Sequence, residues 1–273
     1  MTFCLTMRLE DGLVGIADTR ITTGNECITA RKVTRYQGKN YAFFIMSSGL
    51  RSVRDKTLTY FDELFEAQRS KCDRLFKVCN FFTEQLRKVG KEDREALELS
   101  KLSFNMNTLV GGQMPKDKDP KLYLIYPEGN WVEVGTGTPY AAIGNSGYGK
   151  PVLDRTLHYT DSMQYAFRVG CMAFDSTRIS AADVDYPLDA VIYPRDSFNI
   201  TMQRYDKDDF RDLTRWWQER LRQSVQDLPF EGLDTIFDNV LYKPSNLSVK
   251  RLSDTGHIGV LHTDDILKSN DSN

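Results

Sequence analysis

The sequence predicts an α+β layered sandwich, and the order of its segments supports this fold class. Strand-like segments come in three blocks, at residues 2–47, 103–144 and 188–204. Pairs of helical segments separate these blocks, at 50–88 and 150–178. Strands in blocks and helices in pairs favour helices layered on sheets over alternating βαβ units.

Composition and charge indicate an ordinary globular protein. Hydrophobic residues make up 40% of the 273 residues and charged residues 27%, and the net charge of −2 gives no reason to expect nucleic acid or an anionic membrane as a partner. No apolar run approaches the roughly 18–20 residues of a membrane span, and the N-terminus lacks a secretory signal. We therefore expect a cytoplasmic protein with one domain at 1–225. A partly irregular C-terminal extension at 226–273 is expected to pack on the same domain.

The first block consists of four strand-like segments, at 2–9, 13–20, about 28–36 and 41–47. Asp11-Gly12 between the first two is a strong hairpin signal, because this pair suits a tight turn between antiparallel strands. Gly38 lies in the turn between the last two. The chain is therefore expected to begin with a β-hairpin, followed by a second pair of strands.

Apolar residues then change to a helical period. In the segment at about 50–68, one face carries Leu50, Val53, Leu58, Phe61, Leu64 and Phe65. In the segment at about 70–88, the inner face carries Leu75, Val78, Cys79, Phe82 and Leu86. This spacing predicts two amphipathic helices. The charged segment at 91–101 either extends the second helix or begins another.

The later segments repeat the pattern of strands followed by a helix pair. Strands are expected at about 103–112, 121–126, 130–134 and 140–144. Two helical segments follow from Lys150 to about 178, with a break near 160–162. The final elements expected are strands at about 188–193 and 199–204 and a helix at about 207–225.

Cysteine and histidine spacing argues against several kinds of site. The five cysteines are scattered, with no CxxC pair, so buried free thiols are favoured over disulfides or zinc ligands. The three histidines do not form an HExxH motif, and no GxSxG elbow is present. A serine–histidine hydrolase and a histidine-bound metal are therefore poorly supported, and no cofactor is expected.

Four residues near the first strand indicate a different chemistry. Thr2 begins that strand, and the hairpin returns Asp18 beside it; Lys32 is expected on the third strand. Gly49 is expected to open the first helix, where free backbone N–H groups favour an anion. After removal of Met1, the Thr2 hydroxyl could attack a carbonyl while its own α-amine takes the proton. That amine titrates near 7.7–8.0 when unperturbed, so it is a usable base without histidine.

Each of these residues also has a structural interpretation. In the structural interpretation, Thr2 is only a strand residue and Asp18 is a carboxylate that caps a turn. Lys32 is then a solvated strand residue, and Gly49 is a tight entry to a helix. Spacing alone leaves both interpretations open.

Taken in series, several motifs resemble the proteasome β-subunit superfamily of N-terminal nucleophile hydrolases. They are Thr2, the strand GLVGIADTR, the RKV that contains Lys32, SSGL, and the strand pair LVGGQMPKDKDPKLYLIYPEGNWVEV. Two further stretches, AIGNSGYGKPVLDRTL and ISAADVDYPLDAVIY, are most similar to the bacterial Anbu branch, the ancestral β-subunit. The resemblance covers about residues 2–225 and implies a four-layer αββα sandwich.

The resemblance also implies roles for individual residues. Thr2 would be nucleophile and base, Asp18 and Lys32 its charge partners, and Gly49 the oxyanion donor. Ser146, in a glycine-rich loop of unusual register, and Asp183 (or Asp185) would lie near the Thr2 amine. The family's Asp–x–x–Ser–Gly motif reads Asp183-Val184-Asp185-Tyr186-Pro187 here, so its serine is missing.

Two functions therefore remain. One is a threonine peptidase, or an amidohydrolase of smaller amides, working in a ring or spiral of identical subunits. The other is an assembly protein that retains the fold but little chemistry. The intact set Thr2, Asp18 and Lys32 favours the enzyme, and substitution of Thr2 or Lys32 is expected to remove activity while leaving assembly intact. Docking of an ATP-dependent unfoldase is left open.

Overall fold

The computed structural model describes residues 2–23 and 26–229 of the chain. It divides into a compact unit over Met1–Gln223 and a second unit that begins at Ser224. The expected C-terminal extension lies outside the described residues from position 230 onward. Both sheets and the helices that cover them belong to the first unit.

The first sheet has five antiparallel strands in the order β10-β1-β2-β11-β12. They are β1 (Phe3–Leu9), β2 (Gly12–Asp18), β10 (Tyr140–Gly144), β11 (Leu188–Pro194) and β12 (Thr201–Tyr205). The expected hairpin joins β1 to β2, and its register pairs Cys4 with Ala17. Continuing that register by one residue brings the start of β1 beside Asp18.

The second sheet also has five antiparallel strands, in the order β5-β6-β7-β8-β9. They are β5 (Val33–Gly38), β6 (Tyr41–Gly49), β7 (Met106–Gln113), β8 (Lys121–Ile125) and β9 (Trp131–Glu133). A separate two-stranded ribbon pairs β3 (Arg20–Thr23) with β4 (Glu26–Thr29).

The sequence prediction of one strand over 28–36 was wrong. The chain leaves the β3–β4 ribbon at Thr29 and enters the second sheet at Val33, so residues 30–32 form a break between two strands. Lys32 therefore lies in this break and not within a strand. The break turns the lysine side chain into the interior, where its ammonium meets a carboxylate of the first sheet.

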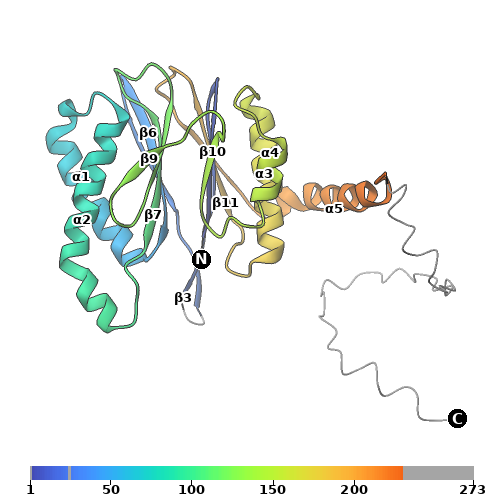
Figure 1. Ribbon diagram of the computed structural model, residues 1–273, viewed down its shortest axis with the longest axis horizontal. Helices are drawn as coiled ribbons and strands as arrows, with labels where there is room; N and C mark the ends of the chain where they lie inside the picture. Colours follow the sequence, from blue (N-terminus) through green and yellow to red (C-terminus); the bar gives the residue numbers. More distant parts are fainter. Residues whose placement is uncertain (1, 24–25, 230–273) are drawn as a thin grey trace, which may run out of the picture. The chain divides into compact units, whose positions relative to one another are not determined.

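Helices cover the outer face of each sheet, which gives four layers (Figure 1). α1 (Arg51–Gln68) and α2 (Leu75–Leu99) pack on the second sheet, and a short 3-10 turn, η1 (Arg69–Lys71), follows α1. α2 runs through the charged segment that begins at residue 91, so that segment extends the helix.

On the first sheet, α3 (Lys150–Thr156) and α4 (Met163–Ser180) form the other outer layer. A 3-10 turn, η2 (Asp208–Phe210), leads into α5 (Arg211–Gln226), which has no buried residue. The αββα sandwich expected from the sequence is confirmed. No helix among the described residues has the length and apolar character needed to cross a bilayer.

Three apolar clusters fill the spaces between these four layers. One lies between α3–α4 and the first sheet, and a second between α1–α2 and the second sheet. The third, the inter-sheet cluster, joins the facing sides of the two sheets and includes Cys4, Ala17, Phe44, Met46 and Leu109. Cysteines of the described side chains are buried free thiols, as expected: Cys4, Cys72, Cys79 and Cys171.

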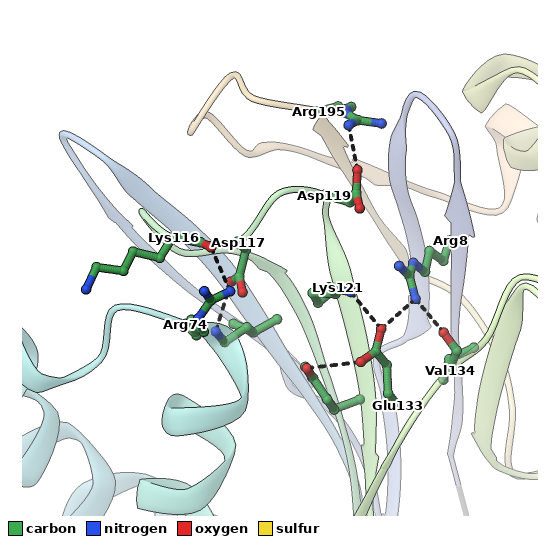
Figure 2. A network of polar contacts seen from close by, with 11 residues as sticks. Arg8, Arg74, Lys116, Asp117, Asp119, Lys121, Glu133, Val134 and Arg195 are labelled. Atoms are coloured by element: carbon green, nitrogen blue, oxygen red, sulfur yellow. Dashed lines mark hydrogen bonds and ion pairs between the residues drawn. The ribbon is translucent and has the colours of Figure 1, made fainter.

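One buried cation also links the two sheets. Arg8 on β1 donates from Nη1 to Glu133 Oε1 on β9 (3.0 Å) and to the carbonyl oxygen of Val134 (2.7 Å). Figure 2 shows this pair together with Lys121, which donates to the same carboxylate oxygen at 2.9 Å. Burial, the largest single effect, raises the pKa of the Glu133 carboxyl. Lys121 and Arg8 together outweigh burial and lower this pKa below its ordinary value. This ionised carboxylate therefore fastens one sheet to the other.

Candidate active site

A buried ion pair lies at the centre of the candidate site. Lys32 Nζ is 2.7 Å from Asp18 Oδ1, and the two side chains are 2% and 0% exposed. The same carboxylate oxygen accepts a hydrogen bond from the backbone N–H of Phe3 at 2.8 Å. Asp18 thus holds both the lysine and the first residue of β1. The two residues singled out from sequence are in direct contact.

Burial and charge act on Asp18 in opposite directions. Removal from water raises the pKa of its carboxyl above the ordinary value, whereas the Lys32 ammonium and the Phe3 N–H oppose that rise. The Lys32 ammonium and the Asp18 carboxylate, 2.7 Å apart, attract each other strongly because water does not reach them. The cation is therefore fixed in place by a partner that has no competing contact with solvent.

Thr2 lies just before β1 and is 8% exposed. Its carbonyl oxygen accepts a hydrogen bond from the N–H of Asn145 at 2.6 Å. Gly144, at a φ of +84°, lies so close that a Cβ built there would be 1.9 Å from that oxygen. Only glycine fits this approach, so the end of β10 holds the backbone of Thr2 tightly. The Thr2 hydroxyl makes no hydrogen bond to any other described residue.

Gly49 is the last residue of β6. The sequence predicted that it would open the first helix, and this prediction was wrong. α1 begins two residues later, at Arg51. The φ of Gly49 is +123°, and a Cβ there would lie 1.9 Å from the carbonyl oxygen of Asn105. A side chain is therefore excluded, both by the backbone conformation and by the neighbouring carbonyl of Asn105.

One cavity of about 560 Å³ brings three of these residues together. Thr2, Lys32 and Gly49 all line it, along with Gly144 and Ser48. Asp18 is enclosed behind Lys32. The cavity thus combines a hydroxyl, a fixed cation and a glycine backbone, which are the groups that an attack on a carbonyl by an N-terminal residue needs.

Ser146 and Asp183 are not placed on this cavity. Ser146 lines a different hollow, which it shares with Tyr140 and Lys150. Asp183 is half-buried and lies between α4 and β11. Asp185, the alternative to Asp183, forms an ion pair with Arg20 at 3.1 Å. The roles of Ser146 and Asp183 remain predictions.

The segment that lacks the family's serine has a structural role. Tyr186 stands at that position, and its ring packs on Phe174 and Phe210 with the guanidinium of Arg178 over it. The next carbonyl, of Pro187, accepts hydrogen bonds from the N–H and the hydroxyl of Thr19. The segment is therefore anchored between α4 and the end of β2.

The cavity also contains residues that were not predicted from the sequence as site residues. They are Ile21, Ser48, Leu50, Arg51, Lys101, Leu102, Ser103, Asn105 and Asn107. Several of them come from the turn after α2, which follows Thr2 by about a hundred residues. Only Ser48 and Leu50 carried a signal, because they flank Gly49 in the motif SSGL.

Comparison with known proteins gives the family of the chain. Residues 2–178 match the family model described as proteasome subunit. The chain belongs to the proteasome subunit family. No protein with a curated description matches it.

Within the proteasome subunit family, solved structures of Anbu proteins are similar to this chain. A Gly-1 mutant of Anbu from Hyphomicrobium sp. strain MC1 is 31% identical, with a TM-score of 0.76, over 83% of this chain and 99% of the other. Anbu from Yersinia bercovieri is 30% identical, with a TM-score of 0.77, over 83% and 98%. Anbu from Pseudomonas aeruginosa, seen as a helical assembly, is 29% identical, with a TM-score of 0.75, over 83% and 97%.

Proposed function

We propose that this protein is a threonine-type amide hydrolase that cleaves peptide or protein substrates. The observation that carries the proposal is the single cavity lined by Thr2, Lys32 and Gly49, with the lysine fixed by buried Asp18. The chemistry requires Thr2 to be the first residue of the mature chain, because only then does it carry a free α-amine.

In the first step, the Thr2 hydroxyl oxygen bonds to the carbonyl carbon of the substrate, and the hydroxyl proton passes to the Thr2 α-amine. The Lys32 ammonium stabilises negative charge that develops on the attacking oxygen. The N–H of Gly49 donates to the oxyanion of the tetrahedral intermediate, an interaction worth about 3–4 kcal/mol in comparable sites.

The intermediate then breaks its carbon–nitrogen bond, and the amine product leaves with the proton that the α-amine held. Water attacks the resulting ester, again with the α-amine as base, and releases the acid and the threonine hydroxyl. Ser146 and Asp183 are proposed to assist proton movement at the amine. This part of the site departs from the family pattern, because Tyr186 replaces the serine.

We propose further that the enzyme works in the cytoplasm as a homo-oligomer, either a ring or a spiral. The helical assembly of the Pseudomonas aeruginosa relative supports self-association. Repeated head-to-tail contacts close into a ring when the rotation allows, and otherwise continue as a spiral. Whether an unfoldase feeds the assembly is a separate question, which a pull-down with the assembled protein would answer.

The experiment compares wild type, Thr2→Ala and Thr2→Ser on short fluorogenic peptides and on casein, after intact mass has established loss of Met1. Thr2→Ala should have background activity, because it lacks the hydroxyl. Thr2→Ser should retain part of the activity, because it keeps the hydroxyl and loses only the methyl group that restricts its rotamer. Activity that survives unchanged in Thr2→Ala would exclude Thr2 as the nucleophile.

The second candidate is an assembly protein with little catalysis. It is favoured by one observation, the replacement of the family's serine by Tyr186, whose ring lies in an aromatic contact with Phe174. Wild type that assembles with a free Thr2 amine, yet cleaves none of the substrates, would support this alternative.

A further inference from the structure

The charge of the candidate cavity indicates which substrates it accepts. Three cationic residues line it: Lys32, Arg51 and Lys101. Among the described residues of its lining, none is aspartate or glutamate. The remaining wall is apolar or carries neutral amides and hydroxyls. A cavity with this lining attracts anions and repels cations.

Pairing with nearby carboxylates removes only part of this positive charge. Asp18 neutralises Lys32. Asp55 lies 3.2 Å from Arg51 and 2.7 Å from Arg54, so one carboxylate serves two guanidinium groups. Lys101 forms no ion pair with any described residue. After these pairings, the cavity and its edge keep a surplus of positive charge.

The backbone of Lys101 is unusual in a way that bears on this charge. Its φ is +58°, in the left-handed region, at the end of α2. The N–H groups of Lys101 and Leu102 donate to the carbonyls of Glu98 (2.9 Å) and Leu97 (2.8 Å), which is the Schellman pattern. Glycine or asparagine usually occupies this position, because a Cβ disfavours the conformation.

A structural interpretation of Lys101 also exists, since a cation near the C-terminus of a helix stabilises the helix dipole. That interpretation predicts an effect on stability only. It does not account for the cavity that the lysine lines together with Arg51, Thr2 and Gly49. Substitutions of Lys101 can therefore separate the two interpretations.

We propose that the cavity binds substrates in which the residue whose carbonyl is attacked is an aspartate or a glutamate. Arg51 and Lys101 determine this specificity. The proposal rests on the proposed hydrolase function. Leu50 and Leu102 would contact the methylene groups of the acidic side chain, and the two cations would face its carboxylate. Hydrogen bonds to a charged group are stronger than those to a neutral one.

The first experiment measures kcat/KM for matched fluorogenic peptides that differ only in this residue: Glu, Gln, Asp, Asn and Lys. Wild type should prefer Glu over Gln by about tenfold or more, a ratio consistent with one charged hydrogen bond. The preference should fall as salt is raised, because salt screens exposed charges. Equal values for Glu and Gln, with Thr2-dependent cleavage of both, would overturn this proposal and leave the hydrolase intact.

The second experiment uses variants of Lys101. Lys101→Gly removes the charge and suits the left-handed backbone, so the variant should fold with a Tm at or above that of wild type. Its Glu-over-Gln ratio should fall toward one, whereas Lys101→Arg should keep most of the ratio. Lys118→Gln is the matched control, an exposed lysine beyond the opposite end of β7. A ratio unchanged in Lys101→Gly would exclude this lysine from specificity.

The third experiment does not require catalysis. Peptides that end in Glu or Gln, with a blocked N-terminus, are titrated into Thr2→Ala by calorimetry. Tighter binding of the Glu peptide, reduced in the double variant Thr2→Ala/Lys101→Gly, would support the anionic specificity even if wild type hydrolyses nothing. Equal affinity for the two peptides would refute it.

Discussion

Replacement of Lys32 by methionine tests whether the buried ion pair stabilises the fold as well as the chemistry. Lys32 and Asp18 are 2% and 0% exposed, so the variant would leave a carboxylate in the interior without its cation. Breaking a buried pair on one side costs about 3–5 kcal/mol. For a compact unit of this size, about 2–4 °C per kcal/mol gives a Tm lower by roughly 6–20 °C.

This expectation differs from the one drawn from sequence, in which a change at Lys32 would leave assembly intact. The difference arises from burial, because a solvated lysine can be removed at little cost, whereas this one neutralises a charge that water does not reach. The double variant Lys32→Met/Asp18→Asn should recover most of the lost stability, since asparagine still offers an oxygen to the Phe3 N–H.

The loss should also depend on pH. Burial raises the pKa of Asp18, and Lys32 opposes that rise, so Lys32→Met lets it rise further. Above the ordinary aspartate pKa, the folded variant then holds a proton that the unfolded chain has released. Its stability therefore decreases as pH rises, by up to about 1.4 kcal/mol per pH unit, until the raised pKa is passed.

Urea denaturation of wild type, both single variants and the double variant at pH 4.5 and pH 8 would measure these effects. The penalty in Lys32→Met should be larger at pH 8. A free energy of unfolding within about 1 kcal/mol of wild type at both pH values would refute the reasoning that this pair is a desolvated charge pair. A double variant as unstable as Lys32→Met would refute the assignment of the cost to unpaired Asp18.

Three further predictions follow from the same geometry. Gly49→Ala should destabilise the fold by more than about 1 kcal/mol in chemical denaturation, because the new Cβ would clash with a backbone oxygen. Gly135→Ala is the control and should not destabilise the fold, because there is open space around Gly135. Phe61→Ala should lower the free energy of unfolding by about 3–5 kcal/mol, and Leu99→Ala, 81% exposed, by under about 0.5 kcal/mol. Activity should fall at acid pH as Asp18 takes up a proton, and it should do so at a pH above the ordinary aspartate pKa. Because the folded state binds this proton more tightly than the unfolded chain, circular dichroism should show an intact fold at that pH.

Local patterns predicted most of the elements. Asp11-Gly12 fixed the first hairpin, because a tight turn leaves few alternative registers, and this placed Asp18 beside the start of β1. The apolar period over 50–68 predicted α1 within a residue at each end. These features depend on neighbours in sequence, and for that reason they could be predicted from it.

The errors arose where distant segments meet. The break at residues 30–32 depends on Asp18 drawing Lys32 into the interior. The conformation of Gly49 depends on the approach of Asn105, which lies just before β7. Lys101 enters the cavity only because α2 is long enough to return the chain there. No periodicity within a single segment carries this information.

The candidate site straddles the two sheets. Thr2 directly precedes β1 of the first sheet, whereas Gly49 ends β6 of the second, and Lys101 follows a helix that packs on the second sheet. The side chains of the inter-sheet cluster, such as Met46 and Phe44, therefore act as a spacer whose thickness sets the gap between Thr2 and Gly49. The geometry of the candidate site can then change through changes of volume at positions that do not line the cavity. An engineer seeking altered rates would begin with the spacer and leave the cavity wall unchanged.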